Sequence, residues 1–301
     1  MSIRSLELRA RVVVEGFWSG LHRSPHHGFS VEFTEYRQYS PGDDPRYLDW
    51  RAFGRTDRHY IKKFEDETNL RCQLVVDQSR SMAFASSDAV PTKAEYAATL
   101  AATLAWFLHL QGDATGLFAF DDRLRDYLPA RHRPGHLRQL MMALEKAPGG
   151  PATDIATPLE TLAGLIRKRG WIVVMSDFLA PLDRLDPALS ALAASGHELA
   201  VFQILDPAEV TFPFQEPAWF EDLESGRTLF IDPQAARAAY QKRLEAHSTA
   251  LRSTCERLGI SCHQVQTSQP LDLVLLEFVR GHGRRGRAIR HARPGAGRVS
   301  R

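Results

Sequence analysis

The sequence predicts a doubly wound α/β fold with a mostly parallel sheet, and two observations carry this prediction. From Arg71 onward, short apolar runs alternate with amphipathic stretches, which is the rhythm of successive strand–helix units. Four of the apolar runs end in aspartate, at Asp77, Asp121, Asp177 and Asp206. Ligands of open α/β sheets bind beyond the carboxyl ends of the strands. We therefore expect helices on both faces of the sheet and a functional site at its carboxyl edge.

The elements follow from the hydrophobic periodicity. Strands are expected over residues 71–77, 114–122, 171–178, 198–206 and 261–267, with an edge strand over 123–130. Helices are expected over 92–110, 134–147, 153–169, 184–195, 233–258 and 271–279. The helix over 153–169 has the clearest apolar stripe, formed by Ile155, Leu159, Leu162 and Ile166. A hairpin over 210–231 is expected to turn at "ESGR".

The chain divides into three regions. Residues 1–70 have a different texture, with aromatic and β-branched residues around the "SPGDD" turn, and predict an irregular, strand-containing extension. Residues 71–280 form the α/β domain. Residues 281–301 are rich in arginine and glycine and predict a basic, disordered tail. Eight arginines and no acid lie between Arg280 and Arg301, so a formal net charge of +2 leaves about −6 on the rest of the chain.

Composition indicates an ordinary globular protein. Of the 301 residues, 44% are hydrophobic and 25% are charged. No run approaches the roughly eighteen apolar residues of a membrane helix, and residues 97–110 are interpreted as a buried core helix. The first residues lack the apolar core of a signal peptide. Cys72, Cys255 and Cys262 are odd in number and lack metal-type spacing, so we expect reduced thiols and a cytoplasmic location.

Oxygen-bearing side chains follow two of the strands. Asp77 is followed by Ser79 and Ser81 in "DQSRS", and Asp177 follows Ser176. Between these strands a glycine-rich loop, "GGPATDI", presents Thr153 where a helix begins. Hydroxyls and carboxylates suit Mg²⁺ or Mn²⁺, and after them Ca²⁺, rather than zinc or copper. The alternative is that the hydroxyls only cap a loop and a helix. Asp121 and Asp206 are interpreted as turn formers or helix caps.

These residues resemble a known family. "DQSRS", the threonine of "GGPATDI" and "SDF" after an apolar strand resemble the von Willebrand factor A domain with its metal-ion-dependent adhesion site. The stretch "HGFSVEFTEYRQYSPGDDPRYLDW" ahead of them is similar to the bacterial domain of unknown function 58 family, and the likeness covers about residues 16–205. The residues that carry this signature are Arg37, Tyr39, Pro41, Gly42, Asp43, Arg46, Asp49 and Trp50.

The resemblance implies a metal held by the hydroxyls of Ser79, Ser81 and Thr153, with Asp77 and Asp177 orienting bound waters or ligating directly. The open position of such a site takes an acidic side chain from a partner. The spacer between Gly150 and Thr153 is longer than the usual "GGT". Some family members carry membrane helices before the signature, and we expect none here.

The resemblance also implies a function. Family members resemble partners of MoxR-type AAA+ ATPases, so we expect a non-enzymatic adaptor or co-chaperone that binds the ATPase or a client protein. The alternative is a metal-dependent hydrolase in which the same ion activates water. No spare general base and no Walker-type phosphate loop is apparent. Specific nucleic-acid binding is not expected, because the arginine tail lacks interleaved aromatic residues.

Two other patterns are interpreted as structural. His22, His26 and His27 have no cysteine or acidic cluster beside them, so an exposed polar loop is favoured over a zinc site. The "YSPGDDPRYLDW" signature is interpreted first as a turn held by charge pairs, and second as a surface recognised by a partner.

Overall fold

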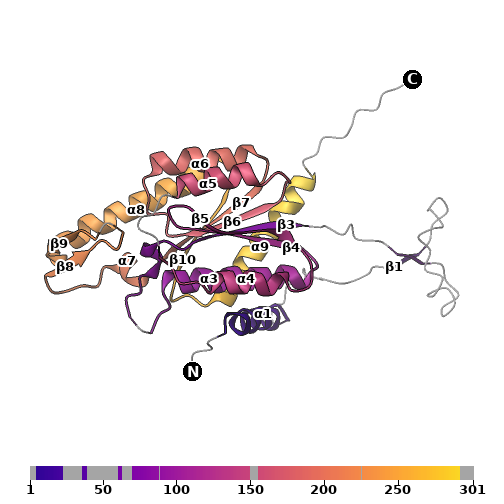
Figure 1. Cartoon of the computed structure of the whole chain (residues 1–301), viewed down its shortest axis with the longest axis horizontal. Helices are drawn as coiled ribbons and strands as arrows, with labels where there is room; N and C mark the ends of the chain where they lie inside the picture. The colour runs from indigo at the N-terminus through magenta and orange to yellow at the C-terminus, as the bar shows by residue number, and fades with distance from the viewer. Residues whose placement is uncertain are drawn as a thin grey trace, which may run out of the picture. The chain divides into compact units, whose positions relative to one another are not determined.

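The computed structural model describes residues 5–22, 36–38, 60–62, 70–87, 89–149, 155–224 and 226–291. The chain forms two compact units. The larger comprises Met1–Ser19 and Leu70–Arg301, and the smaller comprises Gly20–Asn69. The larger unit contains the predicted α/β fold (Figure 1).

A six-stranded sheet forms the centre of the larger unit. Its strand order is β10-β7-β6-β3-β4-β5. The strands in chain order are β3 (Arg71–Asp77), β4 (Ala114–Phe120), β5 (Leu124–Arg131), β6 (Trp171–Ser176), β7 (Glu198–Leu205) and β10 (Ser261–Gln266). All neighbouring pairs are parallel except β4 and β5, so the predicted mostly parallel sheet and its edge strand are confirmed.

Helices cover both faces of this sheet, as predicted (Figure 1). One face carries α5 (Ala156–Leu165), α6 (Leu182–Ala194) and α8 (Pro233–Arg257). The other carries α3 (Lys93–Leu110), α4 (His136–Leu144) and α9 (Leu271–His291). Among the described residues, no helix combines the length and apolarity needed to cross a bilayer.

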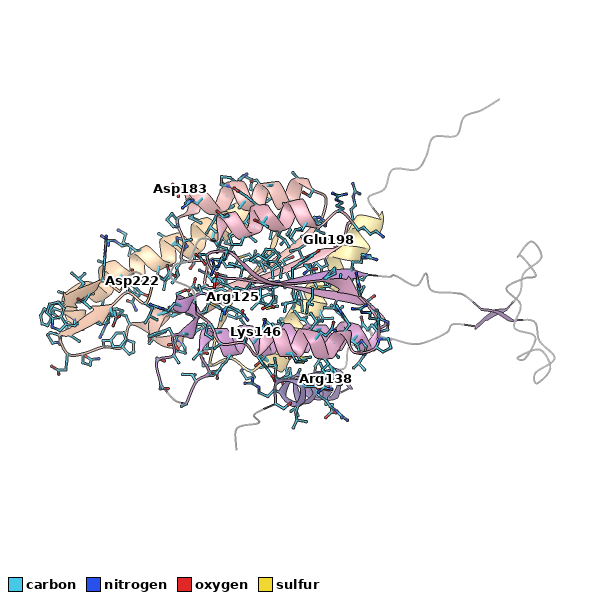
Figure 2. All side chains as sticks on the ribbon, in the orientation of Figure 1. Arg125, Arg138, Lys146, Asp183, Glu198 and Asp222 are labelled. Carbon is cyan, nitrogen blue, oxygen red and sulfur yellow. The ribbon has the colours of Figure 1, made fainter. Side chains whose placement is uncertain are left out.

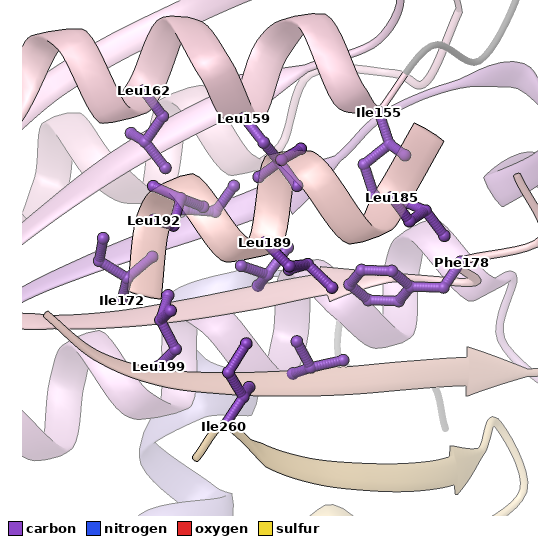
Figure 3. Packing of buried hydrophobic residues seen from close by; sticks show 14 of the residues in the cluster. Ile155, Leu159, Leu162, Ile172, Phe178, Leu185, Leu189, Leu192, Leu199 and Ile260 are labelled. Atoms are coloured by element: carbon purple, nitrogen blue, oxygen red, sulfur yellow. The ribbon is translucent and has the colours of Figure 1, made fainter. Parts of the chain in front are cut away.

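The strands bury alternate residues on the two faces. In β6, Ile172 and Val174 join the core beneath α5 and α6, together with Leu159, Leu162 and Leu189 (Figure 3). On the opposite face, α3 is buried along most of its length between the sheet and neighbouring helices, which confirms the predicted core helix. Its start is fixed by a capping box, in which Thr92 and Glu95 each accept a hydrogen bond from the other's backbone.

The sequence prediction was wrong for the first residues. Leu6–His22 form a helix, α1, whose first part belongs to the α/β unit rather than to an irregular extension. Leu6, Ala10, Val14 and Phe17 fall on one helical stripe and are each at most 4% exposed. The ring of Phe17 meets that of Phe107 in α3 edge-on, at 5.5 Å between centroids. Apolar periodicity at steps of four and three residues was the signal missed.

Two helix ends also differ from the prediction. Helix α5 ends at Leu165, and Ile166 is already extended, ahead of β6 at Trp171. A Cβ at Gly170, just before β6, would lie 2.4 Å from the Arg71 carbonyl oxygen, so this turn needs glycine. Helix α9 continues to His291, so the prediction of disorder from residue 281 was wrong up to that point. Arginine and alanine are good helix formers and outweigh the glycines there.

The predicted hairpin is present. Strands β8 (Ala218–Glu221) and β9 (Thr228–Ile231) pair antiparallel, after a short helix α7 (Pro207–Thr211) that the sequence had not indicated. The smaller unit contains β1 (Tyr36–Gln38) and β2 (Tyr60–Lys62), also antiparallel, so the extension does contain strands. The signature residues from Tyr39 to Trp50, and His26 and His27, lie outside the described residues.

Candidate functional site

Strands β3 and β6 deliver two aspartates to one place. The chain passes from β3 to β4 on one side and later returns to β6 on the other, so the ends of β3 and β6 form the switch point of the sheet. Asp77 is the last residue of β3, and Asp177 follows directly after Ser176 at the end of β6. Asp77 and Asp177 are 0% and 2% exposed. The predicted convergence of these two carboxylates is confirmed.

Asp77 is held by donors from both strand ends. Its Oδ1 accepts the backbone N–H of Ser79 at 2.8 Å, and its Oδ2 accepts the Ser176 hydroxyl at 2.6 Å. Such fixed hydrogen bonds restrict the carboxylate to one orientation. Ser176 was noted in the sequence only as a neighbour of Asp177, and its bond to Asp77 is a feature that the sequence did not indicate.

The two serines of the "DQSRS" segment lie together. Ser79 Oγ and Ser81 Oγ are 3.1 Å apart, just before and within the 3-10 helix η2 (Arg80–Ala83). Two adjacent ligands of an octahedral Mg²⁺, each about 2.1 Å from the ion, are about 3 Å apart. The spacing of these hydroxyls therefore fits neighbouring positions on one small hard cation.

Asp177 has a partner that the sequence did not reveal. The Lys93 ammonium, at the first turn of α3, donates to Asp177 Oδ2 at 2.8 Å and to Glu209 Oε1 at 2.7 Å. The Lys93 side chain is 1% exposed, so this is a buried cation between two carboxylates. The one signal in the sequence is a lysine that opens an otherwise apolar helix. Glu209 also caps α7 by accepting the N–H of Asp206.

The site carries more negative than positive charge. Burial, and then the neighbouring Asp177, raise the pKa of Asp77 to about 7, although hydrogen bonds from Ser176 and Ser79 oppose this. Burial opposes the charge on Lys93, but Asp177 and Glu209 outweigh it and hold the pKa of Lys93 above its usual value. The ammonium of Lys93 thus compensates Asp177 and Glu209, whereas the donors that hold Asp77, a backbone N–H and a hydroxyl, are uncharged. A divalent cation would relieve the remaining repulsion.

The backbone beyond Asp177 is strained. Phe178 has φ of 53°, in the left-handed region that a bulky side chain rarely adopts. Its N–H bonds to Ser176 Oγ at 3.1 Å, and its carbonyl oxygen lies 2.6 Å from His247 Nε2. The Phe178 ring is buried in the core near Leu185 and Leu189 (Figure 3). Packing of this ring supports the turn that presents Asp177. His247 is a further neighbour of the site that sequence spacing could not indicate.

The fifth predicted residue, Thr153, lies outside the described residues. The chain on either side of its loop approaches the site. The Gly149 N–H donates to the Gln78 carbonyl at 3.0 Å, next to Asp77, and Ile155 is buried in the core at the start of α5.

Asp121 and Asp206 have the structural roles expected of them. Asp121 Oδ1 accepts the N–H of Arg123 in a turn. Asp206 caps α7 through the N–H of Ala208 and also accepts the N–H of Ser86.

A cleft of about 500 Å³ opens beside Asp177. One side is formed by Ser81, Lys93 and Asp177, and the other by the β8–β9 hairpin and the aromatic residues that support it. Its lining also includes four further carboxylates, from Glu209, Glu221, Asp222 and Glu224. The site is therefore open to a partner on an acidic, partly aromatic side.

The donor set fits a hard cation held through hydroxyls. No cluster of three or more His, Cys, Asp or Glu suited to a metal occurs in the part of the chain that the structure describes. The hydroxyl pair at 3.1 Å, flanked by two buried carboxylates, is of a different kind and matches the preference of Mg²⁺ for oxygen. All three cysteines are free thiols, away from these residues.

A mostly parallel sheet with hydroxyls and carboxylates at its switch point defines a von Willebrand factor A-like α/β domain. The family model described as "Protein of unknown function DUF58" matches residues 35–250, and the chain belongs to this family. The match includes the signature region and the strands that carry the site.

Two uncharacterized mycobacterial proteins are similar to this chain. The uncharacterized protein Rv1480 of Mycobacterium tuberculosis is 30% identical over 295 residues, which is 96% of this chain and 91% of Rv1480. The uncharacterized protein MAV169 of Mycobacterium avium is 32% identical over 156 residues, or 51% of this chain and 90% of that protein.

Among solved structures, BatB from Bacteroides thetaiotaomicron has a TM-score of 0.47 at 16% identity, covering 71% of this chain and 99% of BatB. The SpRpn10 VWA domain has a TM-score of 0.39 at 12% identity, covering 68% and 93%. This likeness carries no argument about function.

Proposed function

We propose that this protein is a metal-dependent protein-binding module that acts as an adaptor or co-chaperone of a MoxR-type AAA+ ATPase. The observation that carries the proposal is the pair of serine hydroxyls, 3.1 Å apart, beside two buried carboxylates. This arrangement is suited to holding one hard cation at the surface end of the sheet, where a partner can reach it.

Each residue has a defined part in this proposal. Ser79, Ser81 and Thr153 hold Mg²⁺ or Mn²⁺ through their hydroxyls. Asp77 and Asp177 receive hydrogen bonds on both carboxylate oxygens from the protein, and each oxygen retains a lone pair for a water. The two aspartates therefore orient waters and balance charge. The ion supplies a Lewis-acidic position for an anionic oxygen.

The partner contributes that oxygen. Neutral hydroxyl ligands leave positive charge on the ion, so a carboxylate from an Asp or Glu of the partner gains a charge-assisted bond. The rest of the chain is acidic, near −6 without the tail, and does not attract an acidic partner over long range. At physiological salt, screening over about 8 Å leaves contact with the ion as the main electrostatic attraction.

We favour binding over hydrolysis because the polar side chains near the site are already engaged in other contacts. A general base must take up a proton from the water that it activates, and carboxylates committed to an ion and its waters, as Asp77 and Asp177 are in this proposal, are not free to do so. Asp177 and Glu209 are paired with Lys93, and His247 Nε2 lies against the Phe178 carbonyl. The assignment of a MoxR-type ATPase as partner, rather than of another protein, rests on the family resemblance alone.

Binding to a purified MoxR-type ATPase from the same organism tests this proposal. In biolayer interferometry we expect capture with Mg²⁺, none with EDTA, and recovery when Mg²⁺ is restored. Ser79→Ala should abolish capture, whereas Ser253→Ala, at an exposed serine on α8, should not change it. Capture that is indifferent to EDTA and to Ser79→Ala would show that the metal site is not the contact surface.

A further inference from the structure

The β8–β9 hairpin has an inner face with a structural role. Phe220 stacks on Phe212 with ring centroids 5.8 Å apart, and Phe214 meets both rings edge-on. Arg237, on α8, donates to the carbonyl oxygens of Phe212 and Phe214 at 3.0 and 2.7 Å. An isolated two-stranded hairpin is only marginally stable in water, so these contacts hold it in place.

The opposite face of the hairpin has no comparable use. Trp219 and Phe230 are directly cross-strand, with ring centroids 5.4 Å apart, and they are 70% and 56% exposed. Leu229 pairs with Phe220 across the strands, so it lies on the other face of the hairpin, where it is 65% exposed. Large apolar side chains gathered on one exposed element mark interaction sites, and aromatic residues are enriched in them. We call Trp219 and Phe230 the hairpin surface.

Acidic residues lie at the turn end of the hairpin. Glu221 ends β8, and Asp222 and Glu224 follow it in the turn (Figure 2 labels Asp222). These three also line the cleft, together with Asp177 and Glu209. The single lysine in the lining, Lys93, is already paired with two of these carboxylates. With five carboxylates and one lysine in its lining, the cleft favours a positively charged partner.

Aromatic rings and carboxylates together select for a particular chemistry. An Arg or Lys side chain can lay its charge against the faces of Trp219 and Phe230 and also approach Glu221, which is two residues from Trp219 on β8. Apolar side chains of the same partner would cover the remaining aromatic surface. A lipid bilayer also accepts exposed Trp and Phe, but anionic membranes repel the carboxylates at this turn.

We propose that the hairpin surface and the acidic cleft bind a protein segment in which arginine or lysine alternates with apolar residues. This contact goes beyond the metal site: it needs the hairpin rather than the ion. It gives the module a second point of attachment, of opposite charge preference, on a partner or client. Two such contacts on one partner raise the overall affinity through effective concentration.

Labelled peptides on the full-length protein test this proposal. The probes are a fluorescein-labelled peptide of alternating arginine and leucine, the same peptide with glutamate for arginine, and the same with glycine for leucine. Fluorescence anisotropy should show binding of the arginine–leucine peptide alone, in EDTA as well as in Mg²⁺. Persistence in EDTA separates this contact from the metal-dependent one, so either proposal can fail by itself.

Variants locate the binding. The Trp219→Ala/Phe230→Ala double variant should weaken binding at least tenfold, about 1.4 kcal/mol. Met142→Ala, which removes an equally exposed apolar side chain on α4, should leave it unchanged. Urea unfolding of both proteins should give the same midpoint, because Trp219 and Phe230 are not part of the inner cluster.

Three results would overturn the proposal. They are equal binding of the glutamate or glycine peptide, an unchanged affinity of the double variant, and a hairpin-dependent association with phosphatidylcholine–phosphatidylglycerol vesicles in place of peptide binding. The last would identify the hairpin as a membrane contact instead.

Discussion

Lys93 is the residue on which the charge balance of the site depends. Its ammonium is buried between Asp177 and Glu209, and removal of one partner of a buried ion pair leaves the other charges uncompensated. The same ammonium donates to Asp177 Oδ2 at 2.8 Å and so restricts the orientation of that carboxylate. Lys93 is thus a positioning residue for one of the two aspartates.

We expect Lys93→Met to lower the free energy of unfolding by about 3–5 kcal/mol, because two buried carboxylates lose their counter-charge. Urea denaturation measures this change. Lys146→Met removes a salt bridge to Asp126 in which the lysine side chain is 51% exposed, and it should cost no more than about 1 kcal/mol. A loss for Lys93→Met as small as that of the control would contradict the buried-pair account.

At this scale the sequence indicated the site only in part. Asp77, Ser79 and Asp177 could be placed at the carboxyl edge of the sheet from the sequence, because each aspartate directly follows an apolar strand and hydroxyl residues stand beside it. Lys93 and Glu209 could not, since they reach the site from the start of α3 and from α7, far away along the chain. Contacts that long side chains make across the edge of the sheet follow no periodic pattern in the sequence.

Among the elements, α1 departs most from the prediction. It packs against α3, where the ring of Phe17 contacts that of Phe107. The alternating strands and the capped helices were predictable from local pattern. Helix ends were less so: α5 stops at Leu165 rather than at Arg169, and the close approach of Gly170 to Arg71 is a contact across the sheet that the helix pattern does not contain.

Phe17→Ala should lower the free energy of unfolding by about 3–5 kcal/mol, since Phe17 is 4% exposed. Leu8→Ala changes a side chain of the same helix that is 49% exposed and should have little effect. Thermal unfolding of both variants gives the comparison.

A chain that begins at Thr68 loses the whole of α1 and should be insoluble or melt at a lower temperature. An unchanged melting temperature for that chain would mean that α1 is not part of the core.

On the scale of the whole molecule, the larger unit brings two recognition surfaces to the carboxyl edge of the sheet. The hydroxyl pair at the end of β3 and the hairpin that follows β7 lie on two sides of one cleft. The first suits an anionic oxygen through an ion, and the second a cationic, apolar segment. The sequence indicated the first through "DQSRS", but it indicated the hairpin only as a turn, because exposure of Trp219 and Phe230 depends on how α8 supports the inner face.

The central claim is that the end of β3 binds a divalent ion, and titration calorimetry with Mg²⁺ and Mn²⁺ on the purified full-length protein tests it most directly. We expect saturable heats with wild type and with Ser253→Ala, and none with Asp77→Ala or Ser79→Ala, while circular dichroism shows that all four proteins remain folded. Heats that are equal in wild type and Asp77→Ala, or absent from both, would contradict the account.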